Sequence, residues 1–499
     1  MTRTWVRELA GWMLALAVAL VTTASVAASA RGDLLFRDGD SLIVALLSRS
    51  ILEGDRLDWA MSSVLFLPET AVFTVLEAAL PITVDALFAV SAIVNLLALY
   101  GAFRLVAGRR REGSAPVAWS VAALGALGAL AMTETSASRD ALELASLPLT
   151  TTYYSATVVA VVASVGIARR IRDGSAHRAA LLVGLGLVAA VSTLSNPLYA
   201  VWLTAPLVVI LAILALRSRT RTRDLWLVAA LLAGTVAGAG FRIPFSAWIA
   251  NTGAGYAQPA LWMESVEYYG RLLAERLQSP LGLVAAVAVI ALLALGILRT
   301  ARARDDASRL VAIASWALPL AVVIGAVALG THAARYLQPA VFAPLLALVA
   351  DTRALRAPER IGRRITAVSA VALLVGGALS VPRLATAAAT TDPDLACVTS
   401  WVDASERTGA GQFWTVRLPK LHLDDPSRLV QVDHRLDGYA WLVNRADLDA
   451  REVTFLVQDS QSVAWELPVS AVPDAIVECG RWTILDFAST PLPLGPAHS

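Results

Sequence analysis

The stretch "LLALYGAFRLVAGRRREG", residues 96–113, decides how this chain is organised. An apolar run ends there in three consecutive arginines, and such clusters mark the cytoplasmic end of a membrane-spanning helix. Hydrophobic residues make up 57% of the 499 residues and charged residues only 16%. This composition differs strongly from that of a soluble domain, so the sequence predicts an integral membrane protein.

Apolar stretches of about 20 residues recur along the chain, and a helix of that length crosses a hydrocarbon layer about 30 Å thick. The sequence therefore predicts a mainly α-helical, polytopic bundle. We predict eleven spans, with approximate limits 10–29, 85–106, 116–133, 152–168, 179–195, 198–216, 225–241, 281–298, 310–329, 333–350 and 365–382.

The arginine clusters orient these spans because they fall in alternate loops, which places the N-terminus inside and the C-terminus outside. The clusters are Arg3 with Arg7, 109–111, 169–172, 217–223, 299–304 and 353–364. An extra span at 60–80 would put 109–111 outside and reverse every later cluster, so we reject it. A cleaved signal peptide at 1–30, ending in "ASVAASA", is an alternative that leaves the following loop outside as well.

This topology predicts two parts of the chain. Residues 1–383 form the transmembrane part, which includes a long first outer loop at 31–83, and residues 384–499 form an extracytoplasmic domain. Within the first loop, 41–52 and 60–80 are typical of helices that lie in the membrane interface. The predicted location is a bacterial plasma membrane, with membrane lipid around the spans.

The tail from 384 differs in character from the rest, because helical and strand-like patterns alternate in it. This alternation predicts a small α/β or α+β domain. The expected elements are a helix at 392–407 and strands at 412–418, 428–432, 439–443, 452–458 and 481–487. Cys397 and Cys479 both lie here and can pair if the tail is outside the cytoplasm. We find no motif for nucleic-acid binding or a zinc site, and expect no nucleic-acid partner.

Carboxylates gather in the first outer loop. In an extended loop, Asp38 and Asp40 would point the same way. Such acids at the water–lipid boundary could act as a general base or bind a divalent cation, Mg²⁺ or Mn²⁺. The structural alternative is that Asp40 caps the following helix and that Asp55 and Asp58 are turn residues beside Gly54.

A second acidic group, Glu134, Asp140 and Glu143, lies in the outer loop after the third span, with Arg139 beside them. It is either part of the same site or a solvated loop with a local ion pair.

Cations are scarce on the predicted outer face. They include Arg242, His332 and Arg335, the last followed by Tyr336. A guanidinium near the apolar boundary needs an anionic partner, and phosphate is one candidate. The alternative is an arginine that extends to the lipid headgroups.

Together these features resemble the GT-C glycosyltransferases: an inside N-terminus, about eleven spans, acids in the first outer loop, a second acidic loop, an Arg-Tyr-Leu-x-Pro stretch at 335–339 and an outer C-terminal domain. The resemblance implies an inverting enzyme that moves a sugar from a polyprenyl-phosphate donor to a glycan or lipid acceptor outside the membrane. Asp38 or Asp40 would be the base, Glu134 or Asp140 the second acid, and Arg335 with Tyr336, Arg242 and His332 would bind the donor.

Other classes of protein fit part of the pattern. A flippase or transporter for lipid-linked glycan usually places charges near the bilayer midplane and often has internal repeats, which we do not find. A polysaccharide polymerase or ligase would also use a lipid-linked substrate. A non-catalytic envelope scaffold would need none of the acids.

Overall fold

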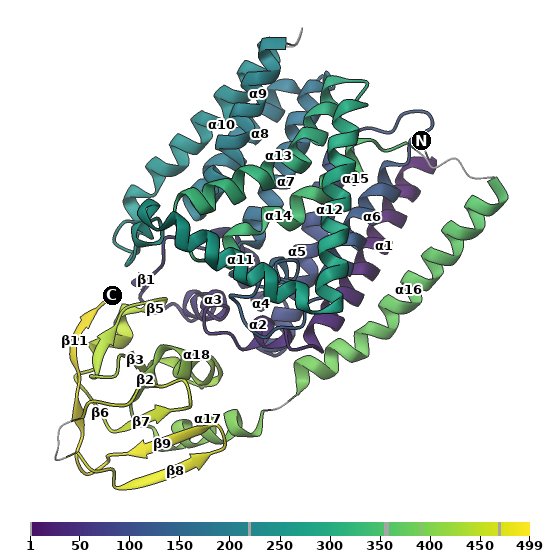
Figure 1. The fold of residues 1–499 in the computed structure, drawn as a ribbon. Coiled ribbons are helices and arrows are strands. Elements are labelled where there is room, and N and C mark those ends of the chain that lie inside the picture. The colour runs from purple at the N-terminus through teal and green to yellow at the C-terminus, as the bar shows by residue number, and fades with distance from the viewer. Residues whose placement is uncertain (1, 218–220, 354–358, 391, 468–470) are drawn as a thin grey trace. The chain divides into compact units, whose positions relative to one another are not determined.

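A computed structural model describes residues 2–217, 221–353, 359–390, 392–467 and 471–499 (Figure 1). The chain divides into two compact units. The helical unit comprises Met1–Leu34, Phe88–Ile243 and Ala254–Ala388, and the mixed unit comprises Leu35–Leu87, Pro244–Gly253 and Ala389–Ser499.

Long helices dominate the helical unit. Its main elements are α1 (Thr2–Ala27), α5 (Val84–Val106), α6 (Pro116–Ala131), α7 (Ser155–Arg172), α8 (Arg178–Ser195), α9 (Ala205–Arg217), α10 (Arg221–Phe241), α11 (Trp262–Gln278), α12 (Pro280–Ala301), α13 (Asp306–Ala328), α14 (Pro339–Phe342), α15 (Leu346–Ala350) and α16 (Glu359–Ala389). The short helix α2 (Gly32–Phe36) lies where the chain passes between the units.

Seven helices in the described part of the chain are long and apolar enough to cross a membrane. Three shorter apolar helices cover Pro116–Ala131, Ala200–Leu216 and Ala334–Ala350. The predicted mainly helical architecture is confirmed, and these helices are consistent with a multi-pass membrane protein. All eleven predicted segments overlap helices, whereas the number that cross a bilayer stays a prediction.

Small residues bring some of these helices into backbone contact. A Cβ atom at Gly234 on α10 would lie 2.3 Å from the carbonyl oxygen of Gly186 on α8, and one at Gly238 would lie 2.3 Å from that of Ala190. Glycines four residues apart therefore form the seam between α8 and α10, which lie side by side in Figure 1. Such close approach is how helices gain contact in an apolar solvent.

The arginine clusters meet at one end of the helical unit. A single hollow is lined by parts of 109–114, 169–173, 299–308 and 350–353, four of the segments predicted to share the cytoplasmic side. The loop 132–146 follows the far end of α6, and α13 runs from Asp306 beside the hollow to Ala328. At a rise of 1.5 Å per residue, the ends of α13 are about 35 Å apart. Predicted basic residues at 218–220 and 354–358 lie outside the described residues.

The mixed unit contains β-structure and short helices, as predicted for the C-terminal part. Its main sheet has the strand order β11-β4-β3-β2-β7-β9-β8. The strands are β1 (Trp59–Ala60), β2 (Gly409–Gln412), β3 (Leu429–Val432), β4 (Asp437–Tyr439), β5 (Val443–Asn444), β6 (Glu452–Val453), β7 (Phe455–Gln458), β8 (Ala475–Cys479), β9 (Trp482–Asp486), β10 (Leu492–Pro493) and β11 (Gly495–His498). The helices are α3 (Ile43–Glu53), α4 (Leu67–Ala79), α17 (Pro393–Ser405) and α18 (Phe413–His422).

The predicted strand at 412–418 is wrong, because these residues begin helix α18. The helix connects β2 to β3, which pair in parallel, and parallel neighbours need such a crossover. Phe413 and residues 415–421 are buried, so their apolar pattern reflects burial on several sides of a helix. The predicted strand at 439–443 is also divided, between the ends of β4 and β5.

Three distant segments build the mixed unit. Trp59 and Ala60 pair with Asn444 and Val443 in an antiparallel ladder. The backbone N–H of Ala250 donates to the carbonyl oxygen of Met61 at 2.9 Å. Residues from 35–87, 244–253 and 389–499 are therefore joined by main-chain hydrogen bonds within one unit.

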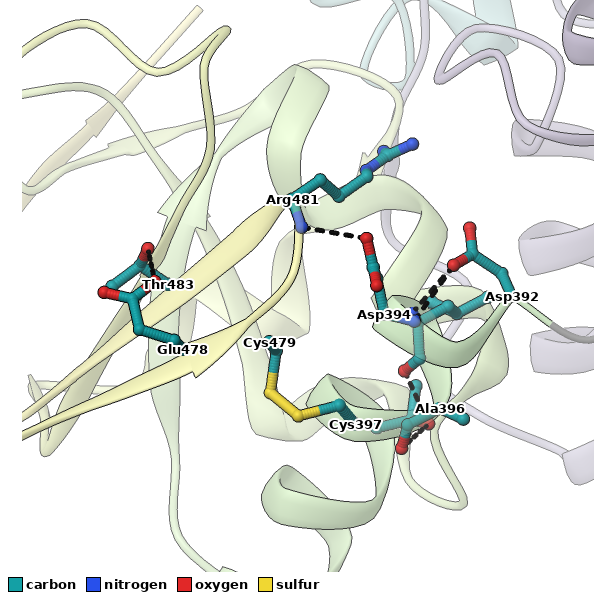
Figure 2. Close-up of a disulfide and its surroundings, with 10 residues drawn as sticks. Asp392, Asp394, Ala396, Cys397, Glu478, Cys479, Arg481 and Thr483 are labelled. Atoms are coloured by element: carbon teal, nitrogen blue, oxygen red, sulfur yellow. Dashed lines mark hydrogen bonds between the residues drawn. A yellow bond between two sulfur atoms is a disulfide. The ribbon is translucent and has the colours of Figure 1, made fainter.

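A disulfide joins Cys397 on α17 to Cys479 at the end of β8, with 5.5 Å between their Cα atoms (Figure 2). Beside it, the carboxylate of Asp394 accepts a hydrogen bond from the backbone N–H of Arg481 at 2.9 Å. The disulfide closes a loop of 82 residues that contains most of the sheet. Because the two cysteines are the only ones in the sequence, a reductant has a single target.

Reduction of this bond should destabilise the mixed unit by about 4.5 kcal/mol in the chain-entropy treatment of an 82-residue loop. The measurement is urea unfolding of the full chain in detergent, followed by limited proteolysis, with and without reductant. The Cys397→Ser, Cys479→Ser double variant should behave like the reduced protein and ignore reductant. Equal midpoints for oxidised and reduced protein would contradict the prediction.

Candidate functional site

Arg335 lies at the centre of a polar group in the helical unit. Its Nη1 is 3.8 Å from the carboxylate of Asp140, and its Nε donates to the hydroxyl of Tyr154 at 3.3 Å. Its guanidinium carbon also lies 5.7 Å from the centre of the Tyr336 ring. The side chain of Arg335 is 19% exposed and that of Asp140 51%, so a solute can reach both charges. We call Asp140, Tyr154, Tyr268, His332, Arg335 and Tyr336 the Arg335 cluster.

Tyr268 on α11 and His332 form an aromatic edge of this cluster, with ring centres 5.4 Å apart. Burial raises the pKa of Tyr268, and the nearby charge of Asp140 raises it further. The phenol therefore stays protonated near neutral pH and can donate a hydrogen bond. His332 is exposed.

Helix α11 holds the segment that carries His332 and Arg335. The hydroxyl of Ser265 donates to the carbonyl oxygen of Thr331, and the hydroxyls of Tyr269 and Thr331 are bonded, both at 2.7 Å. Gly330 has φ +61°, and a Cβ there would lie 1.9 Å from the carbonyl oxygen of Gln258. Only glycine fits this turn.

The same helix fixes the loop that carries Asp140. Arg276 near the end of α11 forms an ion pair of 2.6 Å with Glu143, and both side chains are over 90% buried. Its Nη2 donates to the hydroxyl of Thr133 at 2.7 Å. Glu143 also accepts from the backbone N–H groups of Thr135 and Ser136. The loop is thus anchored on both sides of Asp140.

Glu134, like Glu143 a predicted acid of this loop, is buried within it. Its carboxylate accepts from the backbone N–H groups of Ala145 at 2.6 Å and Ser146 at 2.9 Å. Burial raises its pKa, while Arg31 at 3.8 Å and these hydrogen bonds act in the opposite direction. These contacts orient Glu134 toward the backbone of its own loop, so Asp140 is the more accessible acid.

Arg242, another predicted donor-binding residue, follows α10. Its Nη1 donates to the carbonyl oxygen of Leu194 at 2.7 Å. Leu194 lies in the last turn of α8, where carbonyl groups lack helical partners. Arg242 therefore caps α8.

The first-loop acids belong to the mixed unit, where residues 39–42 form turns rather than the extended loop that we expected. The carboxylate of Asp38 accepts from the backbone N–H of Ser41 at 3.3 Å. The alternative that Asp40 caps the next helix is wrong, because the N-cap residue of α3 is Leu42 and makes no side-chain cap bond. Gly54, with φ +77°, ends α3 as its C-cap residue, whereas Asp55 and Asp58 both follow it in an irregular segment rather than in an assigned turn.

A buried arginine faces these acids. Arg417 on α18 is fully buried, and its Nε donates to the carbonyl oxygen of Gly39 at 3.3 Å. Burial lowers its pKa to about 10, whereas the charges of Asp40, Asp447 and Asp38 act to raise it. Its Nη2 has no hydrogen-bond partner among the described residues. The Arg417 guanidinium is therefore bonded to the residue between Asp38 and Asp40, and the charges of both acids act on it.

Asp38 and Asp40 were also predicted to hold a divalent cation. Within the described residues, no group of three or more His, Cys, Asp or Glu side chains could hold a metal ion. Arg417 already supplies positive charge beside the two acids. A divalent cation at Asp38 and Asp40 stays a prediction, and we derive no step through a metal ion.

Several residues that shape these groups were not identified from the sequence: Arg31, Tyr154, Tyr268, Arg276 and Arg417. Arg276 could have been identified, because α11 is strongly amphipathic. An arginine on the buried face of such a helix needs an acidic partner. Arg417 was not identified because residues 412–418 were predicted to form a strand rather than part of a helix. Neither a comparison with protein-family models nor a search of curated proteins gives a match to this chain.

Arg276→Ala should destabilise the helical unit by about 3 to 5 kcal/mol, because it leaves Glu143 buried and unpaired. The measurement is thermal unfolding of the full chain in detergent. Arg271→Ala is the matched control on the same helix: its partner Glu275 is 3.8 Å away and both side chains are exposed, so the midpoint should barely move. Similar losses for the two variants would rule out a special role for the buried pair.

Proposed function

We propose that the chain is a membrane glycosyltransferase that moves a sugar from a polyprenyl-phosphate donor to a cell-envelope glycan or lipid. The observation that carries the proposal is the contact between Arg335 and Asp140: a reachable guanidinium beside a reachable carboxylate, at one end of a set of apolar helices. A donor with a lipid tail and a phosphate head needs both an apolar surface and an arginine. Location on the outer face of a bacterial plasma membrane is part of this proposal.

Arg335 would bind the donor phosphate. The planar guanidinium matches two phosphate oxygens, and the negative charge on the phosphate grows as the bond to the sugar breaks. His332 is exposed nearby and Tyr268 presents a protonated phenol, so both could donate further hydrogen bonds. Tyr336 packs against the guanidinium and helps to orient it.

Asp140 would accept the proton of the attacking hydroxyl. In the structure its carboxylate is 3.8 Å from Arg335, and a phosphate that takes its place would release it. The acceptor oxygen then attacks the sugar carbon, the carbon–oxygen bond to phosphate breaks, and the proton passes to the carboxylate, with inversion at that carbon. The sequence also assigns the base to Asp38 or Asp40, and this remains the alternative within the proposal.

Backbone strain at Tyr154 supports a functional role for this cluster. Tyr154 has φ +68°, a region that residues with a Cβ rarely adopt. Its hydroxyl nevertheless accepts from Arg335, and its ring contacts Trp202 with 5.8 Å between ring centres. Strain of about 1 to 3 kcal/mol persists where surrounding contacts hold a side chain in a required position.

The test is lipid-carrier and glycan profiling of a strain that lacks the gene, complemented with variants. Loss of the gene should cause one polyprenyl-phosphate sugar to accumulate and one glycan to lose that sugar. Arg335→Ala and Asp140→Asn should reproduce the deletion, with transfer slowed by about 100-fold or more. If Asp140→Asn retains transfer, loss of transfer in Asp38→Asn or Asp40→Asn would identify that residue as the base.

Glu275→Gln serves as the control, because Glu275 is an exposed acid on α11 that pairs only loosely with Arg271. It should restore the wild-type profile. Unchanged lipid carrier in the deletion strain, or full activity of Arg335→Ala at normal protein level, would refute the proposal. Membrane abundance of each variant must be measured in the same cells, so that loss of protein is not mistaken for loss of activity.

A further inference from the structure

The end of the helical unit remote from Arg335 contains a hollow of about 460 Å³ that is rich in arginine. Seven arginines and four acids line it, which leaves a formal excess of three positive charges. The lining comes from the segment between α5 and α6, the end of α7, the α12–α13 connection and residues 350–353. Arginines from four segments that are far apart in sequence therefore line the same hollow.

Two of the arginines are fixed by main-chain carbonyl groups. Arg169 donates to the carbonyl oxygens of Val106 at 2.6 Å and Val349 at 2.8 Å. Arg299 donates to the carbonyl oxygen of Leu348 at 3.0 Å and lies over the Trp119 ring at 5.3 Å. These bonds hold the guanidinium groups in place at little further cost in side-chain entropy on binding.

The fixed arginine Arg169 keeps unused hydrogen-bonding capacity. It is only 6% exposed, and its Nε has no hydrogen-bond partner among the described residues. The closest carboxylate oxygen, on Asp173, lies 3.9 Å away, too far for a hydrogen bond. Gly108, with φ +78°, packs so closely that a Cβ there would lie 3.1 Å from this Nε.

The acids of the hollow are largely committed to other arginines. Arg111 pairs with Asp173 at 3.1 Å and with Asp305 at 3.3 Å, and Arg353 pairs with Asp351 at 3.3 Å. Within the described residues, the side chains of Arg302 and Arg304 have no ion pair or hydrogen bond to a carboxylate, and both are exposed. Arg302 and Arg304 in the α12–α13 connection therefore supply uncompensated positive charge to the hollow.

We propose that this hollow binds a phosphate-bearing anion, with Arg299, Arg302 and Arg304 as its principal contacts. Arginine forks match phosphate oxygens in pairs, and several converging guanidinium groups select a multiply charged phosphate over a carboxylate. The apolar side chains of Leu295 and Leu298 line the same hollow. These leucines would contact an alkyl segment next to the phosphate, as in a lipid. The arginines would bind the phosphate group equally well in a lipid headgroup or in a soluble phosphate. The site does not depend on the proposed sugar transfer.

The experiment uses the full chain in phosphatidylcholine nanodiscs. One arm titrates inorganic phosphate and pyrophosphate and follows binding by calorimetry. The other replaces part of the lipid by phosphatidic acid or phosphatidylglycerol and counts retained lipids by native mass spectrometry. Binding in the first arm indicates a soluble ligand, and retention in the second arm alone indicates a lipid headgroup.

The Arg302→Ala, Arg304→Ala double variant should weaken binding by about tenfold or more, because each lost charge-assisted contact lowers affinity severalfold. Arg110→Ala is the control: it removes one positive charge from the segment between α5 and α6, but Arg110 does not line the hollow. It should change affinity less than twofold. Equal losses for the two variants, or no binding of any probe to the wild-type chain, would overturn the proposal. Thermal unfolding without ligand checks that the exposed substitutions leave the fold intact.

Discussion

The buried ion pair between Arg276 and Glu143 determines the geometry of one end of the helical unit. It joins α11 to the loop 132–146, and the neighbouring bonds of Ser265 and Tyr269 join the same helix to the segment before Arg335. Asp140 and Arg335 therefore approach each other because one helix holds both of their segments. A buried charge pair is a poor source of net stability, but breaking it is costly, which makes it an effective positional constraint.

The mixed unit uses a buried charge in a different way. Arg417 is enclosed by α18, the turn at Gly39 and the backbone near Leu442, so its position depends on two segments far apart in sequence. The acids Asp38, Asp40 and Asp447 provide compensating charge. In both units, a guanidinium that donates to backbone carbonyl groups joins pieces of chain that have no covalent connection nearby.

Much of the helical unit could be predicted from the sequence, because about 20 apolar residues in a row have few structural alternatives. The mixed unit was harder. A strand of two residues such as β1 has no periodicity, and α18 is buried on most sides, so it lacks the one-sided apolar pattern that identifies a helix. For the candidate site, the residue types and the loops of Asp140 and Arg335 were predictable. That Glu134 turns into its own loop was not, since its partner Arg31 lies 103 residues away and nothing local marks the pair.

The pairing of β1 with β5 has a consequence for synthesis of the chain. Asp58 and Arg445, which flank this ladder and are bonded to each other, are 387 positions apart. At a translation rate of about 5 to 20 residues per second, β1 waits roughly 20 to 80 seconds for its partner. During that interval its main-chain groups are open to mispairing with other newly made chains. A chaperone that shields residues near Trp59 until the ribosome finishes would therefore raise the yield of native protein, and truncated products would be prone to aggregate.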